Sequence, residues 1–229
     1  MHPLENVIWN ALTTRQAHFA ESCDGARRFL REVTALCAFE HPEEEGYNSL
    51  ARLTGKGGTA AIFLDKPYEA RVGWEYVVGA PLLQMVCENG TSAPAPSPSL
   101  QILQLGDDDS PEMLELTAMT KPGPFGPRTH ELGYYAGIRV SGKLVAMAGE
   151  RLKVPGYTEV SAVCTHPDHL GKGYAAALMT NVMRCIRARG ETPFLHVRAD
   201  NSRAIAIYER LGFRTRWAGH FAVLRSTDS

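Results

Sequence analysis

Two glycines, Gly171 and Gly173, stand between an apolar run and a helical pattern, at a spacing that could bind an anionic group. The run Thr158–Thr165 is typical of a buried strand, and residues 173–189 have the periodicity of an amphipathic helix. A glycine turn lets successive backbone N–H groups converge. The first turn of the helix adds unpaired N–H groups and the positive end of the helix dipole. The segment therefore predicts a site for a pyrophosphate.

One ligand that fits this segment is a dinucleotide. The spacing Gly171-x-Gly173-x-x-Ala176 matches G-x-G-x-x-G/A, and Glu191 lies 20 residues after Gly171, near where an acid that binds ribose is expected. That pattern normally opens a doubly wound sheet with several further strand–helix units. Only 58 residues follow Gly171, so its position in the chain argues against a dinucleotide.

A second segment, Asn201–Phe213, favours a different ligand. Its sequence, N-S-R-A-I-A-I-Y-E-R-L-G-F, fits N-x-x-A-x-x-x-Y-x-x-x-G-F throughout. With the glycine turn before it, the chain resembles the GNAT superfamily of acyl-CoA-dependent N-acyltransferases, which pairs that segment with a [Q/R]-x-x-G-x-[G/A] phosphate loop. Leu170–Ala175 matches the loop except at Leu170, where Gln or Arg is usual. Contacts from that position are mainly backbone, so the departure weakens a side-chain contribution more than the site.

The resemblance covers about Leu100 to Leu224. The segments Val163–His169 and Ala148–Arg151 look most like the glycine-N-acyltransferase-like branch of the superfamily. Such a resemblance implies a mixed, mostly antiparallel central sheet flanked by helices. It also implies acetyl-CoA, or another acyl-CoA, as co-substrate and direct transfer to an amine in a ternary complex, without an acyl-enzyme.

The resemblance also assigns roles to residues. The edge of the strand at Val163–Thr165 would pair with the pantetheine arm and polarise the thioester carbonyl through a backbone N–H. Asn201 would approach the pantetheine or the phosphates, and Tyr208 would protonate the departing thiolate, since a phenol can give a proton and recover it from solvent. The expected cofactor-binding residues are Val163, Cys164, Thr165, Leu170, Gly171, Lys172, Gly173, Tyr174, Ala175, Asn201, Ala204 and Tyr208.

The general base that neutralises the amine is expected to be Glu159, near the start of the central strand, because charged residues on central strands seldom serve packing. Glu150 and His196 are alternatives and, with Arg128, are the residues expected to contact the acceptor. An ion pair with Arg151 or Arg139 would explain either glutamate without catalysis, and ordered water could also relay the proton.

Two further arrangements would place different chemistry in the same segment. Cys164 as a nucleophile, paired with His166 or His196, predicts a covalent acyl-enzyme, whereas a small buried residue on a central strand explains this cysteine better. Cys164, His166 and His169 could suggest zinc, yet no fourth ligand stands at a useful spacing, so we expect no metal.

Arg128 follows a rigid segment, Lys121–Pro127, in the region that usually walls the acceptor site in the resembled fold. A guanidinium there could hold the carboxylate of an amino-acid acceptor, or it could simply be a surface residue after a turn. A small-molecule amine or amino acid is therefore the expected acceptor.

The elements that position these residues can be predicted along the second half of the chain. We expect strands at 100–105, 133–140, 143–151, 158–165 and 193–198, and a last strand or hairpin at 213–224. Helices are expected at 110–120, with Ser110 as N-cap, at 173–189, and from Asn201 or Ser202 to Gly212.

The first half carries no visible chemistry. It has helical patterns at 24–36 and 43–53 and strand-like runs at 59–64, 74–78 and 82–87. Residues 91–99, rich in proline and serine, predict a linker. The sequence thus predicts an N-terminal α/β domain over 1–95, either a degenerate copy of the acetyltransferase fold or a separate cap, and an acetyltransferase domain over 96–229.

Composition narrows the partners. A net charge of −1 gives no electrostatic case for nucleic acid or a membrane surface, and no apolar run reaches the length of a transmembrane helix. The five scattered cysteines are typical of reduced thiols, so we expect a cytoplasmic protein, monomeric or homodimeric. A non-catalytic module that binds acyl-CoA and regulates a partner is the alternative to an enzyme.

Overall fold

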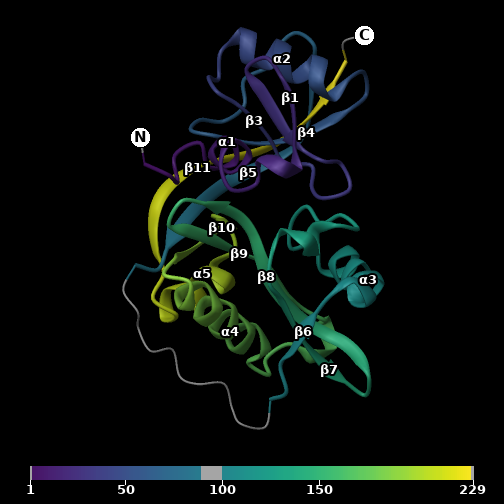
Figure 1. Ribbon diagram of the computed structural model, residues 1–229, viewed down its shortest axis with the longest axis vertical. Helices are drawn as coiled ribbons and strands as arrows, with labels where there is room; N and C mark the ends of the chain where they lie inside the picture. The colour runs from purple at the N-terminus through teal and green to yellow at the C-terminus, as the bar shows by residue number, and fades with distance from the viewer. Residues whose placement is uncertain (1, 89–99, 228–229) are drawn as a thin grey trace.

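Figure 1 shows the fold in a computed structural model, which describes residues 2–88 and 100–227. The predicted linker, residues 91–99, lies outside the described residues. The helices are α1 (Val7–Thr13), α2 (Glu44–Thr54), α3 (Ser110–Thr120), α4 (Tyr174–Ala188) and α5 (Ser202–Arg210), with short 3-10 turns η1 (Ala17–Phe19), η2 (Asp107–Asp109), η3 (Thr129–Leu132) and η4 (Pro167–His169). None of the described helices has both the length and the hydrophobicity needed to cross a bilayer.

The described residues form two sheets. The small one has the order β1-β2-β3, and the large one has the order β4-β11-β5-β10-β9-β8-β7-β6. The strands are β1 (Ala20–Cys23), β2 (Ala26–Phe29), β3 (Cys37–Phe39), β4 (Thr59–Leu64), β5 (Trp74–Val86), β6 (Leu103–Leu105), β7 (Tyr135–Val140), β8 (Lys143–Val154), β9 (Tyr157–Thr165), β10 (Thr192–Arg198) and β11 (Arg214–Ser226). Neighbours in the large sheet are antiparallel except β9 and β10, which confirms the predicted mixed, mostly antiparallel sheet flanked by helices.

Helices cover both faces of the large sheet. Alternate residues of each strand point to opposite faces, and on one face Leu195 and Val197 pack with α4 and α5. On the other face Phe194 packs with α1, while Met147 packs with α3. This division into two faces matters because Glu159 and His196 lie on the α1 face, and the predicted phosphate loop leads into α4 on the other.

The N-terminal residues supply the small sheet, with α2 packed on it and on β4, and also part of the large one. β5 pairs with β10 on one side and with β11 on the other, and β4 pairs with β11 (Figure 1). Strands from before and after residue 95 thus interleave in one sheet. The predicted boundary near residue 95 therefore does not divide the large sheet into two parts.

Most predicted elements form. The helix predicted at 110–120 is α3, with Asp109 rather than Ser110 at its N-cap position, and the strand predicted at 59–64 is β4. The two runs at 74–78 and 82–87 join into the single strand β5, because β11 pairs along its whole length. The last predicted strand is the long β11, without a hairpin.

The helix predicted at 24–36 is wrong. The chain there forms a hairpin of β1 and β2, which turns at Asp24 and Gly25 and brings Cys23 opposite Ala26. Asp24 has a positive φ of 45°, which a short polar side chain tolerates. The Asp-Gly pair is a turn signal, and it outweighs the helical spacing of the apolar residues after it.

We predict that Gly149→Ala destabilises the fold. Gly149 lies directly opposite Tyr135 in the β7–β8 ladder, and an added Cβ would overlap the buried Tyr135 ring. Overpacking of this kind costs about 1–3 kcal/mol in the free energy of unfolding, to be measured by chemical denaturation. Gly106→Ala is the control, because a Cβ there meets nothing within 4 Å. Equal stability of the two variants would contradict this account.

Candidate functional site

β9 and β10 separate after a short parallel pairing. Only Tyr157, Thr158 and Glu159 of β9 pair with β10, opposite Thr192, Pro193 and Phe194. Farther along, β9 pairs only with β8, through a register shift at which Ala162 takes a positive φ of 51°. Such a bulge bends its strand and increases the twist. Beyond these three pairs β9 and β10 form no ladder, and we call this separation the gap in the sheet.

A cavity of about 360 Å³ lies where the edge of β9, the glycine turn and α5 meet. All the predicted cofactor-binding residues line it, from β9 through the turn to Asn201, Ala204 and Tyr208. We call this cavity the glycine-loop cleft. Its other lining residues are His169, Ala176, Arg203, Ile207 and Arg210.

The glycine turn has the geometry that anion binding needs. Gly171 and Gly173 have φ angles of 79° and 77°, a region that costs glycine little and other residues more. α4 begins directly afterwards at Tyr174 and runs for 15 residues. Its first N–H groups have no partner within the helix, so they and the helix dipole favour a negative group in the cleft.

The charges of the side chains around the glycine-loop cleft also favour a negative group. Lys172, Arg203 and Arg210 line it, and none of its described lining residues is acidic. The sequence analysis missed Arg203 and Arg210. Their spacing could have predicted their place in the cleft, because residues 203, 207 and 210 lie on the side of a helix next to Ala204 and Tyr208.

The α5 residues are held in defined positions. The Asn201 side chain caps the helix, its Oδ1 accepting a hydrogen bond from the Ala204 N–H at 3.1 Å. Tyr208 packs against Phe213, and burial raises the pKa of Tyr208 to about 12. The phenol therefore keeps its proton at neutral pH, as a proton donor must.

Glu159 lies on the opposite face, in a buried ion pair. Arg151 donates to both of its carboxylate oxygens, at 2.7 and 2.8 Å, and His196 Nδ1 lies 2.6 Å from Oε1. Burial acts to raise the pKa of Glu159, but Arg151 and then His196 outweigh it and hold the pKa at about 2. The carboxylate is thus a permanent charge at neutral pH, and it lines neither of the two cavities described here.

The hydrogen bonds continue from His196 across the sheet. Arg216 donates to Gln84 Oε1 at 3.2 Å, so the Gln84 amide nitrogen faces His196 Nε2 and the Leu4 carbonyl, each at 3.2 Å. This arrangement makes His196 Nε2 an acceptor and puts its proton on Nδ1, toward Glu159. One residue of this chain of contacts comes from each of five adjacent strands, in the order β8, β9, β10, β5 and β11.

Gln84 and Arg216 were also missed by the sequence analysis. The polar side chain of Gln84 within the apolar run of residues 82–87 could have indicated a buried polar contact. With His196, they line a second cavity, of about 590 Å³, on the α1 face of the sheet.

The other predicted acceptor residues lie elsewhere. Glu150 is buried and pairs with Lys153 at 3.0 Å and Arg189 at 2.7 Å. Arg128 is half exposed and makes a bidentate ion pair with Glu131. Neither residue lines the glycine-loop cleft or the larger cavity, so the structure does not bring them together with Glu159 and His196.

Cys164 lines the glycine-loop cleft, but its environment favours the thiol. Burial raises the pKa of Cys164 to about 11, and a nucleophilic cysteine needs the thiolate. Packing on β9 explains this residue without a covalent intermediate. Within residues 2–88 and 100–227, no three His, Cys, Asp or Glu side chains converge as a metal site.

Known proteins resemble both the fold and the cleft region. A family model described as FR47-like protein matches residues 135–222. A crystal structure of a putative acetyltransferase from the GNAT family of Novosphingobium aromaticivorans is 36% identical, has a TM-score of 0.89 and covers 99% of each chain.

Two curated relatives match shorter segments. The N-alpha-acetyltransferase RimI of Mycobacterium tuberculosis is 36% identical over 84 residues, which is 35% of this chain and 52% of that protein. A mycothiol acetyltransferase of Streptomyces coelicolor is 45% identical over 58 residues, 25% of this chain and 19% of that protein. The matches thus span about half of the first relative and a fifth of the second.

We predict that Glu159→Gln destabilises the protein by about 3–5 kcal/mol, because it leaves the Arg151 guanidinium buried without a counter-charge. Chemical denaturation measures the loss. The control is Glu131→Gln, which removes a similar bidentate pair at the surface and should cost less than about 1 kcal/mol. Equal costs would show that burial does not set the strength of the pair.

The same substitution should alter the response to acid. The pKa of Glu159 is lower in the folded protein than in the unfolded chain, so its contribution is present above about pH 4.3 and is lost as the pH falls through about 2. The free energy of unfolding should therefore fall less steeply over this window in Glu159→Gln. An unchanged slope would contradict the low pKa.

Proposed function

The chain belongs to the GNAT family of acetyltransferases, and on this basis we propose that it transfers an acetyl group from acetyl-CoA to a primary amine in a ternary complex. The observation that carries the proposal is the convergence of the glycine turn, the free edge of β9 and Tyr208 on the glycine-loop cleft. A non-catalytic acyl-CoA-binding module would not need a protonated phenol there.

The glycine-loop cleft fits the CoA part of the substrate. Its turn directs backbone N–H groups at one place, and its three cationic side chains suit the phosphates of CoA. The departure at Leu170 leaves this fit intact, because Leu170 is half exposed and the N–H groups come from the backbone. The part of β9 that lacks a β10 neighbour can pair with an amide-containing arm as a strand would.

Direct transfer requires two proton movements by residues of this chain. The neutral amine nitrogen forms a bond to the acetyl carbon, the carbon–sulfur bond breaks, and the nitrogen loses to solvent the one proton that the amide does not keep. Tyr208 donates its hydroxyl proton to the departing sulfur and regains a proton from solvent. A backbone N–H at Val163–Thr165 stabilises the developing oxyanion.

For the amine proton we propose His196 Nε2 as acceptor, which requires it to exchange its contact with the Gln84 N–H for the amine, and Glu159 as a positioning residue. Glu159 is a poor base, because its carboxylate is held by Arg151 and has a pKa of about 2. It is well placed to orient His196 and to stabilise the imidazolium. His196 also lies two residues beyond Phe194, the last β10 residue paired with β9, and so borders the gap between the strands.

The acceptor is a primary amine. One of the two curated relatives is named an N-alpha-acetyltransferase and the other a mycothiol acetyltransferase, so the names do not share one acceptor. A glycine-N-acyltransferase-like specificity gains no support from Arg128, whose guanidinium is already paired with Glu131.

The cytoplasmic location and the oligomeric state stay predictions.

Calorimetric titration tests the cofactor assignment. We expect acetyl-CoA and CoA to bind at micromolar concentration and NADH not to bind, since the glycine turn lies in a mostly antiparallel sheet and not in the doubly wound parallel sheet of a dinucleotide fold. Binding of NADH alone, or of none of the three, would overturn the proposal.

We predict that Tyr208→Phe lowers kcat about 100-fold and leaves the Kd of acetyl-CoA within about twofold, because only the proton donor is lost. Release of free thiol measures turnover. Tyr76→Phe is the control, since it makes the same change at an exposed tyrosine that lines neither cavity. Unchanged turnover in Tyr208→Phe would remove the assignment.

We further predict that His196→Asn lowers kcat/KM about 100-fold at pH 7 and that the deficit shrinks at higher pH, where more of the amine is already neutral. A pH profile distinguishes this role from a structural one, which would lower the rate equally at every pH. His18→Asn, at an exposed histidine, is the control.

A further inference from the structure

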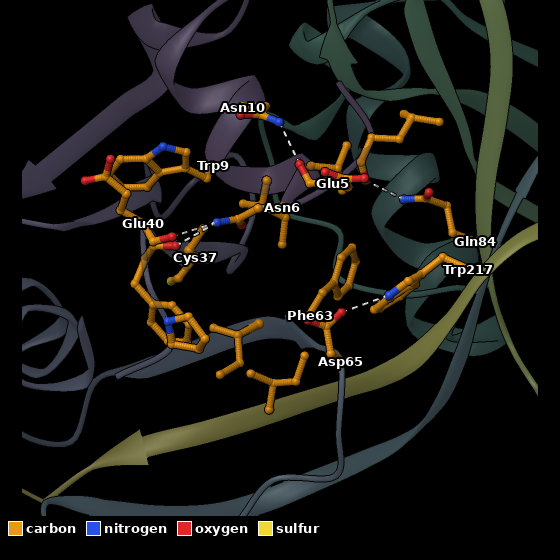
Figure 2. Close-up of a pocket in the computed structure, with 18 of the residues that line it drawn as sticks. Glu5, Asn6, Trp9, Asn10, Cys37, Glu40, Phe63, Asp65, Gln84 and Trp217 are labelled. Atoms are coloured by element: carbon orange, nitrogen blue, oxygen red, sulfur yellow. Dashed lines mark hydrogen bonds between the residues drawn. The ribbon is translucent and has the colours of Figure 1, made fainter. Parts of the chain in front are cut away.

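The larger cavity, of about 590 Å³, is bounded by the α1 segment on one side and by strands of the large sheet on the other. Figure 2 shows Asn6 and Trp9 facing Phe63, Asp65 and Trp217 across the space. We call it the α1 cavity. Its volume lies in the range of small-molecule sites in proteins.

The α1 cavity has the opposite charge to the glycine-loop cleft. Three carboxylates, of Glu5, Glu40 and Asp65, stand among its described lining residues against the single guanidinium of Arg216. The Arg216 guanidinium lies 3.7 Å from the Glu5 carboxylate and compensates that charge. The negative charges of Glu40 and Asp65 are not compensated by Arg216. Carboxylates in excess around a concave site attract cations.

Most of the remaining lining is aromatic or apolar, beside the polar side chains of two asparagines, two histidines and Gln84. Trp9, Phe39, Phe63 and Trp217 line the α1 cavity together with Leu4 and Ile62; the Arg27 guanidinium already lies over the Trp9 ring, 5.4 Å from its centroid. The Trp217 indole N–H donates to Asp65 Oδ1 at 2.9 Å, which fixes both the ring and the carboxylate (Figure 2). Aromatic faces beside carboxylates bind organic cations through cation–π and ionic contacts together.

The α1 cavity also borders the gap in the sheet. His196 forms part of its wall, and Phe63 packs on the His196 ring with centroids 4.5 Å apart. The Nδ1 of His196 bonds Glu159, which belongs to the last β9–β10 pair. His196 and Glu159 thus link the α1 cavity, on one face, to the last β9–β10 pair, beyond which the β9 edge lines the glycine-loop cleft; no described residue lines both cavities.

We propose that the α1 cavity is the acceptor site and that it selects an organic cation, an amine with an aromatic or aliphatic body and no carboxylate. This inference rests on the proposed acetyl transfer. It gives the N-terminal residues a function, because residues 4–10, 37–42 and 62–65 supply most of the lining of the cavity. The amine enters as a cation and passes one proton to His196 before it attacks.

The test compares two acceptors, 2-phenylethylamine and phenylalanine, which differ by one carboxylate. Thiol release with acetyl-CoA should give 2-phenylethylamine a kcat/KM at least about tenfold higher, because the carboxylate of phenylalanine meets like charges. A higher value for phenylalanine, or no acetylation of 2-phenylethylamine by a protein that binds acetyl-CoA, would overturn the inference.

A charge-removing variant locates the effect. Asp65→Asn keeps an oxygen for the Trp217 N–H and should raise the KM for 2-phenylethylamine about tenfold, with the KM for acetyl-CoA unchanged. Asp108→Asn makes the same change at an exposed residue outside the cavity and should alter neither constant. Equal amine KM values for the two variants would overturn the inference.

These outcomes separate the inference from the proposed function. If the calorimetric titration finds no acetyl-CoA binding, the acetyltransferase assignment itself fails. If acetyl-CoA binds and amines are acetylated, but Asp65→Asn behaves like Asp108→Asn, only the acceptor site is misplaced. Quenching of tryptophan fluorescence by 2-phenylethylamine gives an independent readout, because Trp9 and Trp217 line the α1 cavity.

Discussion

The separation of β9 from β10 after three residue pairs is the constraint on which the rest of the structure depends. Two parallel neighbours in the middle of a sheet normally satisfy each other's backbone groups. Here the far part of β9 keeps an edge free, and the strand is held in place by β8 through a bulge at Ala162. The gap exposes backbone groups at the centre of a well-packed sheet, where a ligand can use them without further rearrangement.

The two faces of the sheet then acquire different chemistry around this gap. On the α4 and α5 face, the glycine turn, the start of α4 and three cationic side chains build an anion site. On the α1 face, carboxylates and aromatic rings surround the larger cavity. Such a division suits the proposed transfer between an anionic acyl carrier and a cationic amine, because each face attracts one of the two substrates.

The buried contacts from Arg151 to Gln84 join the strands on either side of the gap. A buried ion pair adds little to stability relative to apolar packing, because both charges must be desolvated. Breaking such a pair is costly, however, so it can fix the positions of the groups it contains. Arg151 and Glu159 thereby hold His196 in one tautomer beside the gap, where β9 and β10 no longer hold each other.

The sequence by itself determined the local parts of this protein. The glycine turn, the strand before it, the helix after it and the α5 segment follow from residue types at short spacing, and all of the predicted cofactor-binding residues meet at one cleft. Only the tertiary structure decided the contacts between distant segments. It placed β5 between β10 and β11, brought Gln84 and Arg216 to the neighbourhood of His196, and assembled the α1 cavity from residues 4 to 217. Local periodicity and turn chemistry act over a few residues, whereas strand order and cavity lining depend on which distant surfaces pack together, and a single sequence does not display that choice.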